Sequence, residues 1–274
     1  MQAKRVFLLV ALTATLETPL VASIRVAVQA VPRRTRAVRH SVGQRLMWIG
    51  AHPDDEGLVV PIIANECAQN ASACRFLVFT HGERGDCALV SGCGDLGSLR
   101  ATEMMKAASL LNADLLLWGF SDVGESVGAT WSAEAGGHEK LIDQISRAVA
   151  DFNPTIVYTF DPNHGSTCHP AHRAVGELVL EAISQERSPD LILIETVAIF
   201  AGNGIEFSSA AKDAVEVDVS DQWDYLIRDV QAHTSQFTPQ QVESLRATPI
   251  EKRRAFIFRS PLPLQPEYTF HCDQ

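Results

Sequence analysis

The sequence has no uninterrupted apolar stretch of the roughly 18–20 residues that a membrane-spanning helix requires. It also has few basic residues: 23 Lys and Arg stand against 33 Asp and Glu, which gives a net charge of −10. Eight of the basic residues lie within residues 1–45, where Glu17 is the one acid, so the remainder carries −17. Because phosphate contacts need a positive surface, this acidic body argues against nucleic acid as a partner.

The sequence also lacks internal repeats and low-complexity segments. Its 274 residues are 46% hydrophobic and 20% charged, which is ordinary for a globular protein and excludes disordered, collagen-like and coiled-coil classes. A chain of this length can bury a large core in one domain. We expect a single domain over residues 45–274.

Residues 1–44 are expected to lie outside that domain's core. Lys4-Arg5, the apolar stretch Val6–Leu16 and the small residues Ala22 and Ser23 resemble an export signal. A disordered extension is the alternative, and both an exported and a cytoplasmic location stay open.

The six cysteines contain no CxxC spacing, so a cysteine zinc knuckle is not expected. Cys67/Cys74 and Cys87/Cys93 are close pairs that could form disulfides outside the cytosol, whereas free thiols would fit a cytosolic protein. Cys168, beside His169, is interpreted as a bystander or half of a disulfide, with an additional metal ligand as the alternative.

From Leu46 onward, short apolar runs alternate with longer amphipathic segments. Strands are expected at Leu46–Ala51, Phe76–Thr80, Leu115–Phe120, Thr155–Phe160, Leu191–Ile199, Ala214–Val219 and Phe256–Phe258. Helices are expected at Gly57–Gln69, Ser98–Asn112, Glu139–Phe152, Pro170–Glu186 and Asp221–Gln236. Continuously apolar strands separated by helices indicate βαβ units. The predicted fold class is α/β: a Rossmann-like three-layer sandwich with a mostly parallel sheet, Gly-rich loops at 81–97 and 121–137, and an irregular part beyond residue 200.

Polar clusters follow two of these strands. Residues 51–56 read AHPDDE, with one imidazole and three carboxylates, and residues 161–172 contain DPNHG followed by HPAH. Ligands of open parallel sheets bind beyond the carboxyl ends of the strands, so both clusters lie where a site is expected.

The spacing of these clusters suits a metal ion. His52 and Asp55 lie three apart at a strand-to-helix turn, and His169 and His172 lie three apart at a helix start, on one face. Two imidazoles and one carboxylate leave an open position on zinc, as in hydrolytic sites. The alternative is that one pair caps a helix and the other is a pair of surface histidines.

AHPDDE after the first strand and HPxH after a later one resemble the LmbE-like or PIG-L family of zinc-dependent N-acetylglucosaminyl deacetylases. Looser matches are Thr80–Glu83 (THGE), Arg100-x-x-Glu103 and Asp161–Asn163 (DPN). Together they span roughly residues 45–180.

The resemblance implies that one Zn²⁺ is held by His52, Asp55 and His172, with Asp54 as general base. It implies that His169 stabilises the oxyanion or protonates the leaving amine. The residues are consistent with these roles, because Asp54 lies beside a ligand and His169 lies one helical turn from another. Two departures are that Ala171 stands where the family often has aspartate, and that the 165–168 loop lacks a tyrosine. Asp161 is a candidate to orient His169 instead.

Possible substrate contacts form a second set. They are Glu83, Arg84, Trp131, Asp161, Asn163 and His164. Arg84 could reach a hydroxyl or carboxylate of a sugar, and Trp131, in a predicted loop, could stack on a sugar ring.

The predicted activity is hydrolysis of the N-acetyl group of an N-acetylglucosamine unit in a glycoconjugate, with a glycopeptide antibiotic precursor as one candidate. A small-molecule deacetylase of thiol-cofactor synthesis and a non-catalytic sugar-binding protein are the alternatives. A nicotinamide dehydrogenase is disfavoured, because a polar loop separates the GxGxxG match at Gly92–Gly97 from the preceding strand. The sequence does not indicate the oligomeric state.

Overall fold

The computed structural model describes residues 43–69, 73–124, 126–184, 189–201, 204–259, 262 and 266–272. The expectation for residues 1–44 therefore lies outside the described residues, apart from Gly43 and Gln44. Within the described ranges, no helix is both long and apolar enough to cross a bilayer.

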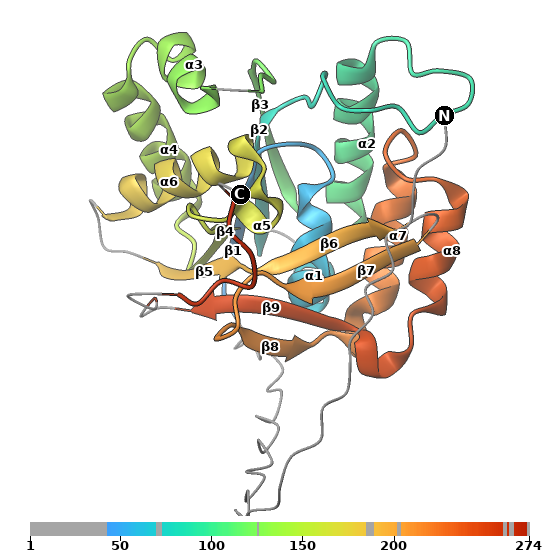
Figure 1. The fold of residues 1–274 in the computed structure, drawn as a ribbon. Coiled ribbons are helices and arrows are strands. Elements are labelled where there is room, and N and C mark those ends of the chain that lie inside the picture. The colour runs from blue at the N-terminus through green and yellow to red at the C-terminus, as the bar shows by residue number, and fades with distance from the viewer. Residues whose placement is uncertain are drawn as a thin grey trace, which may run out of the picture. The chain divides into compact units, whose positions relative to one another are not determined.

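A seven-stranded sheet forms the centre of the described domain (Figure 1). Its strands are, in spatial order, β3 (Asp114–Phe120), β2 (Cys74–Thr80), β1 (Leu46–Gly50), β4 (Ile156–Phe160), β5 (Asp190–Ile194), β9 (Arg254–Arg259) and β8 (Val215–Asp218). The first five strands are parallel, whereas β9 pairs antiparallel with both β5 and β8. The predicted α/β sandwich with a mostly parallel sheet is confirmed, as is the edge strand near 214–219.

Alternate residues of the central strands face two separate hydrophobic layers. Trp48 and Phe76 pack toward α1 (Val60–Gln69), α2 (Leu96–Leu110), α7 (Trp223–Ala232) and α8 (Pro239–Ala247). Met47 and Leu77 pack toward the other layer. Its helices are α3 (Val127–Glu134), α4 (His138–Phe152) and α6 (Pro170–Ser184).

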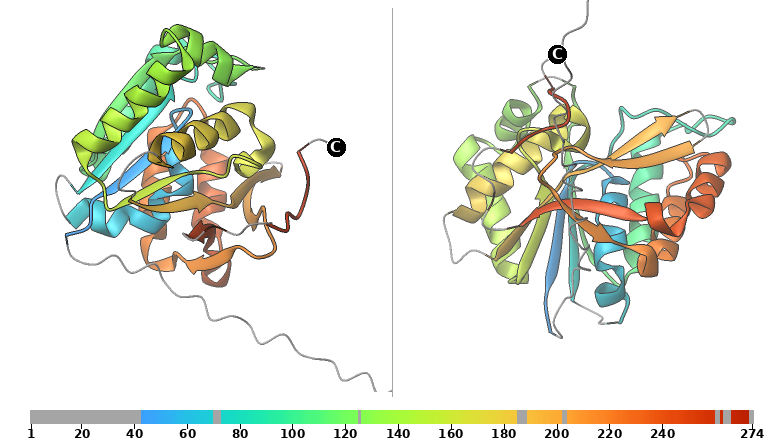
Figure 2. Two further views of the ribbon diagram at one scale, coloured as in Figure 1. Left: turned by 90° about the vertical axis from the view of Figure 1, so that its left-hand side faces the viewer. Right: turned by 60° about the horizontal axis from the view of Figure 1, so that its bottom comes forward.

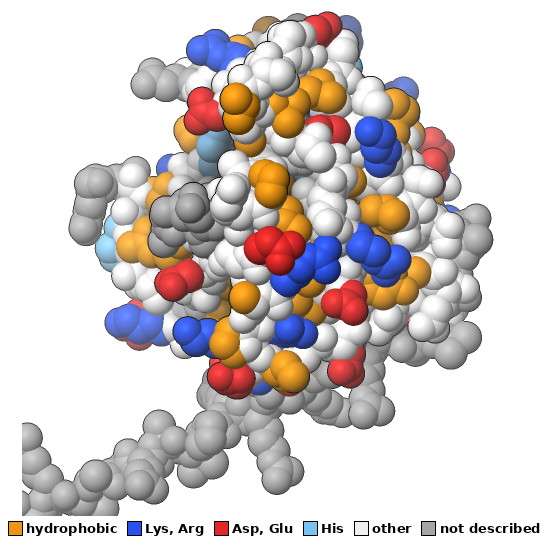
Figure 3. Space-filling view, turned by 90° about the vertical axis from the view of Figure 1, so that its right-hand side faces the viewer, with side chains coloured by type: hydrophobic (Ala, Val, Ile, Leu, Met, Phe, Trp, Pro, Cys, Tyr) orange, Lys and Arg blue, Asp and Glu red, His pale blue; other side chains and the backbone are white. Residues whose placement is uncertain are grey.

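The right-hand view of Figure 2 shows the green and yellow helices on one side of the strands, and the blue, teal and red helices on the other. From the side that carries α8, Figure 3 shows acidic and basic side chains interspersed with small hydrophobic groups. This pattern is expected for the solvent face of amphipathic helices.

The predicted strand Leu191–Ile199 is wrong as one element. The chain bends at Glu195, and Thr196–Ala201 (β6) leaves the main sheet to pair with Gly204–Ser209 (β7) as a hairpin. The backbone of Glu195 hydrogen-bonds to Phe256 and Ala210 outside the ladder, which ends the strand.

Two further corrections concern segments expected to be irregular. The 121–137 loop contains helix α3, and the part beyond residue 200 contains strand β7 and helix α8, neither of which was expected. Helix α7 confirms the helix expected at Asp221–Gln236. Thr238 begins α8 with a capping box to Gln241, followed by proline in the first turn. The sequence TPQQ was a usable signal for this helix. The described residues also form the short 3₁₀ helices η1 (Asp55–Leu58), η2 (Ser220–Gln222) and η3 (Ile250–Lys252).

The six cysteines form three disulfides, Cys67–Cys74, Cys87–Cys93 and Cys168–Cys272. For the two close pairs, the disulfide alternative is the one that the structure contains. Cys168 is a disulfide half, which excludes it as a metal ligand in this structure. Its partner lies 104 residues away in sequence, so this bond joins the C-terminal segment to the loop before α6.

Glu195 leads to a prediction about pH. It is fully buried, and neither carboxyl oxygen has a partner among the described residues. Burial and the Asp161 and Asp213 charges raise its pKa to about 9. The folded state therefore binds a proton that the unfolded state releases, so this group's contribution to stability falls as pH rises from about 4.5 to 9.

We expect Glu195→Gln to remove that dependence. Nearly three pH units of linkage between pH 5 and pH 8 correspond to about 4 kcal/mol. Because 1 kcal/mol corresponds to roughly 2–4 °C, the melting temperature of the variant relative to wild type should rise by about 8–16 °C between these pH values. Calorimetry at both pH values measures the difference, and an equal difference at the two pH values would contradict the prediction.

Candidate active site

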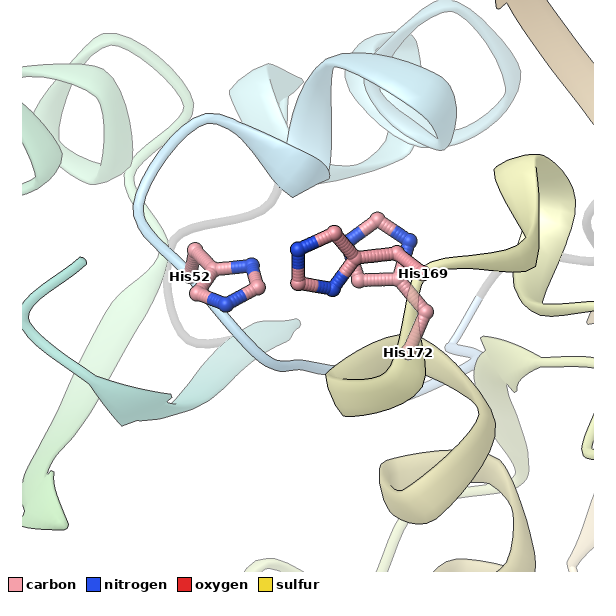
Figure 4. A group of neighbouring side chains, drawn as sticks. All are labelled: His52, His169 and His172. Carbon is pink, nitrogen blue, oxygen red and sulfur yellow. The ribbon is translucent and has the colours of Figure 1, made fainter. Parts of the chain in front are cut away.

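The loop after β1 and the start of α6 meet at the carboxyl edge of the sheet. Figure 4 shows His52 facing His169 and His172 across this gap. The ring centroid of His169 lies 4.9 Å from that of His52 and 4.7 Å from that of His172. β1 and β4 are neighbours at the point where the strand order reverses, which is where ligands of such sheets bind.

Asp55 holds the loop after β1 in place. Its Oδ2 accepts hydrogen bonds from the backbone N–H groups of Ala51 and His52, at 2.9 and 2.8 Å. The same oxygen lies 3.5 Å from Nδ1 of His52, and Oδ1 lies 3.0 Å from Nε2 of His172. The carboxylate therefore links the two predicted histidine ligands.

His172 is fixed by its surroundings. Its Nδ1 lies 3.0 Å from the carbonyl oxygen of Gly165 and can donate to it, which leaves Nε2 free of a proton. Its ring stacks on Phe160 at the end of β4, with the centroids 4.0 Å apart. Gly165, in the short helix α5 (Gly165–Cys168), has φ +57°, and a Cβ there would come within 2.9 Å of His172 and Arg173. Only glycine fits this position.

The carboxylates beside the three histidines favour positive charge at this site. Burial alone would lower the pKa of His52, but the Asp55 and Asp122 carboxylates raise it to about 10. Burial alone would raise the pKa of Asp55, but the His172 and His52 side chains hold it well below its usual range. One nitrogen each from His52, His169 and His172 lies within 4.8 Å of the others, with the Asp55 carboxylate beside them. These imidazole and carboxylate donors fit Zn²⁺.

Asp54 lies at the start of this cluster in a strained conformation. Its φ is +104°, in the left-handed region that non-glycine residues avoid. Its backbone N–H donates to Glu56 Oε2 at 2.9 Å, and Oδ1 accepts from Arg100 at 2.9 Å. Burial raises the pKa of Asp54 to about 6, against the lowering effect of Arg100. A carboxyl group with this pKa can accept a proton near neutral pH.

Arg100 positions Asp54 from helix α2. Besides Asp54, it donates to the carbonyl oxygens of Pro53 and Gly82. Gly82, with φ +64°, lies against the guanidinium, so the turn after β2 also packs on Arg100. The match at Arg100-x-x-Glu103 therefore supports the AHPDDE loop.

A buried polar group lies behind Asp54 and was missed by sequence reasoning. Glu56 Oε1 lies 2.5 Å from Nε2 of His233, and both side chains are fully buried beside Asp229. Glu56 and other nearby carboxylates raise the pKa of His233 to about 9, although burial opposes this. Glu103 accepts from Thr234 and Ser235 and fixes the same turn. No local motif marks His233 or Asp229, because their partners lie more than 170 residues away.

His169 is exposed, whereas His52 and His172 are buried. Its Nδ1 accepts from the backbone N–H of Ala171 at 3.3 Å, so the neutral ring carries its proton on Nε2. Burial and the neighbouring His172 and His52 lower the pKa of His169 to about 4. The prediction that Asp161 orients His169 is wrong, because Asp161 accepts from Tyr268 and Asn163 instead.

Asp122 is a further residue that the sequence reasoning did not select. It follows β3, and its Oδ1 lies 3.5 Å from Nε2 of His52. Asp122 accepts from the backbone of Arg84, and its own N–H donates to Glu83. The position of Asp122 directly after a predicted strand was the feature of the sequence that could have identified it as a site residue. A polar pocket of about 220 Å³ is lined by His52, Arg84, Gly85, Arg100, Asp122, Val123, Gly124 and His169.

The remaining predicted substrate contacts lie elsewhere. Trp131 is fully buried in α3, donates to the carbonyl oxygen of Ser121 and packs on Phe79, so its predicted role in stacking on a sugar is wrong. His164 is buried and stacks on Tyr268, which contradicts a substrate contact. Asn163 is exposed, but its amide donates to Asp161 and Tyr268.

A family model described as GlcNAc-PI de-N-acetylase (PIG-L) matches residues 47–183, which contain both histidine segments. The chain belongs to the PIG-L family. Residues beyond 183 supply β5 to β9, α7 and α8 and lie outside the family match.

Two curated relatives are named as deacetylases. A 1D-myo-inositol 2-acetamido-2-deoxy-α-D-glucopyranoside deacetylase of Rhodococcus opacus is 33% identical over 168 residues, or 54% of this chain and 56% of the relative. A probable N-acetyl-α-D-glucosaminyl L-malate deacetylase of Bacillus anthracis is 27% identical over 74% of this chain and 86% of the relative. The chain thus spans little more than half the length of the first of these relatives.

Solved structures share the fold of the PIG-L chain described here. N,N′-diacetylchitobiose deacetylase from Pyrococcus horikoshii matches with a TM-score of 0.57 at 16% identity, covering 80% of this chain and 84% of that one. The teicoplanin deacetylase Orf2, in a zinc-inhibited form, matches with a TM-score of 0.52 at 16% identity, covering 79% of this chain and 99% of that one. At these identities the likeness concerns the fold.

The donor set leads to a prediction about metal content. Replacing His172 or Asp55 by alanine should remove bound zinc, since loss of a ligand costs more than the ~10–100-fold lost with supporting residues. Elemental analysis of the dialysed proteins measures this. His138→Ala, at an exposed histidine that pairs with Glu181, is the matched control and should retain zinc. One zinc per chain in the His172 variant would contradict the assignment.

Proposed function

We propose that this chain is a zinc-dependent amide hydrolase that removes the acetyl group from an N-acetylglucosamine unit, giving acetate and the free amine. The observation that carries the proposal is the convergence of His52, Asp55, His169 and His172 beside Asp54. A general base next to a cation-binding cluster is what amide hydrolysis requires. Family membership supports the same activity.

Each residue has a defined task in this proposal. His52, Asp55 and His172 hold the metal, which when bound supplies Lewis acidity to the carbonyl and to water. Asp54 takes a proton from the attacking water, and Arg100 keeps that carboxylate ionised and directed. His169, with its proton on Nε2, donates a hydrogen bond to the developing oxyanion or to the leaving nitrogen, and the proton that Asp54 takes from water goes to the amine.

Arg84 and Asp122 are proposed to bind the sugar. Both line the polar pocket that contains His52 and His169, and both can hydrogen-bond to hydroxyl groups. Glu83 acts through Asp122, whose backbone N–H it accepts, rather than by direct contact.

Two kinds of aglycone are candidates. The names of the curated relatives favour a small glycoside, such as an inositol or malate conjugate of the amino sugar. A glycopeptide antibiotic precursor is the second candidate, since deacetylases of teicoplanin and A40926 pseudoaglycone share the fold. Comparing kcat/KM on a small glycoside and on a glycopeptide distinguishes them.

Asp54→Asn separates catalysis from binding. We expect it to keep zinc but to lower turnover by about 10²–10⁴-fold, because the variant has no proton acceptor. Acetate release from an N-acetylglucosaminide measures turnover, and Asp151→Asn, at an exposed aspartate of α4, is the control. Sugar binding by wild type without acetate release would favour a non-catalytic sugar-binding protein and overturn the proposal.

The three disulfides favour an oxidising compartment over the cytosol. Protein isolated from its native host and denatured without reductant should then show no cysteine reactive to a thiol label. Labelling of all six cysteines would contradict export.

A further inference from the structure

A second pocket, on another side of the histidine cluster, is apolar. Its volume is about 180 Å³. It is lined by Asp54, Asp55, Gly57, Leu58, Thr167, His172, Ala198, Ile205, Phe207, Leu226, Val230, Phe237 and Leu245. Apart from Thr167, every polar side chain in this lining belongs to the catalytic cluster. The pocket thus offers a hydrocarbon surface directly beside the proposed reaction centre, with little to hydrogen-bond a sugar.

The two pockets differ in which catalytic residues they contain. His169 and His52 line the polar pocket, whereas Asp54 and His172 line the apolar one. In the proposed function the amino sugar lies in the polar pocket with Arg84 and Asp122, and therefore on the side of His169. The nitrogen and the alkyl carbon of an amide are bonded to different sides of the trigonal carbonyl carbon. The alkyl part of the acyl group is therefore directed toward the apolar pocket.

We propose that this pocket binds the hydrocarbon chain of an N-acyl group longer than acetyl, so that the enzyme is a de-N-acylase of medium-chain N-acylglucosamine units. This inference rests on the proposed function and specifies its substrate. The bond changes are those of hydrolysis: the amide C–N bond breaks, a C–O bond forms to water, and a water proton goes to the amine. The products are a medium-chain carboxylate and the free amino sugar.

The size of the pocket supports this occupant. A cavity of roughly 10–15 Å³ holds one water molecule, which is close to a methyl group in size. The methyl group of an acetyl substituent would therefore leave most of the 180 Å³ unfilled. A chain of several carbons fills it and buries apolar surface on both partners.

The walls of the pocket come mainly from outside the family match. Ala198 and Phe207 are directly paired across the β6–β7 hairpin, and Leu226 and Val230 come from α7 (Figure 1). All lie beyond residue 183, where the match to the family model ends. Acyl-chain specificity would thus be a property of this chain's C-terminal half, added to a shared catalytic cluster.

The test is a chain-length series on the zinc-loaded wild-type protein. The substrates are methyl glycosides of N-acetyl-, N-butyryl- and N-hexanoylglucosamine, together with the hexyl glycoside of N-acetylglucosamine. Each methylene that enters the pocket should raise kcat/KM by about fourfold, the factor that corresponds to ~0.8 kcal/mol. We expect the hexanoyl substrate to exceed the acetyl substrate at least tenfold (roughly, after incomplete burial), with no such gain for the hexyl glycoside.

Neighbouring residues of β6 give a matched pair of variants. Ala198 lines the pocket, whereas Ile199 points to the other face of the hairpin and is 47% exposed. Ala198→Phe should lower the ratio of hexanoyl to acetyl kcat/KM by about tenfold, because the ring fills the space of several methylenes. Ile199→Phe should leave that ratio unchanged.

The possible results separate the two proposals. Hydrolysis of the acetyl substrate with no gain for longer acyl chains would overturn the acyl-pocket inference and leave the proposed function standing. A higher kcat/KM for the hexyl glycoside than for the methyl glycoside of N-acetylglucosamine would assign the pocket to the aglycone. That result would also overturn the acyl-pocket inference. If no N-acylglucosamine of any length is hydrolysed, both proposals fail.

Discussion

The arrangement of the site depends on one carboxylate, that of Asp55. One of its oxygens accepts two backbone N–H groups at the end of β1, and the other lies against His172 from α6. It therefore fixes the loop conformation and joins two segments that are more than 100 residues apart. A buried carboxylate in this position needs positive charge beside it, which the raised pKa of His52 reflects and a bound cation would supply.

The same loop contains a residue in a strained conformation, Asp54, and contacts from neighbouring elements stabilise that conformation. Asp54 adopts a conformation that costs a non-glycine residue roughly 1–3 kcal/mol. Arg100 holds its side chain, and Glu56, itself paired with His233, holds its backbone. Arg100 of α2 and His233 at the end of α7, on one face of the sheet, thus act on the conformation of the proposed general base.

Sequence reasoning succeeded where the information was local. The apolar run of β1 followed by AHPDDE, and the helix that begins at Pro170, place their polar residues by short-range rules alone. It failed where long-range contacts decide the outcome. Trp131 lies in a Gly- and Ser-rich segment that reads as a loop, yet packing on Phe79 and Phe120 gives it a helix and buries it. Glu195 reads as part of an apolar run, but hydrogen bonds to distant segments end the strand there. Asp229 and His233 carry no local pattern, since only the tertiary fold brings them to Glu56.

The bond between Cys168 and Cys272 has a consequence for how the protein is made. The last described residues close onto the loop that leads into α6, where Tyr268 also donates to Asp161. Domains acquire structure from the N-terminal end as the ribosome delivers the chain. In this molecule the surroundings of the histidines are complete only after Cys272 has been synthesised and oxidised with Cys168, so a nascent chain that has not reached Cys272 lacks this bond beside His169.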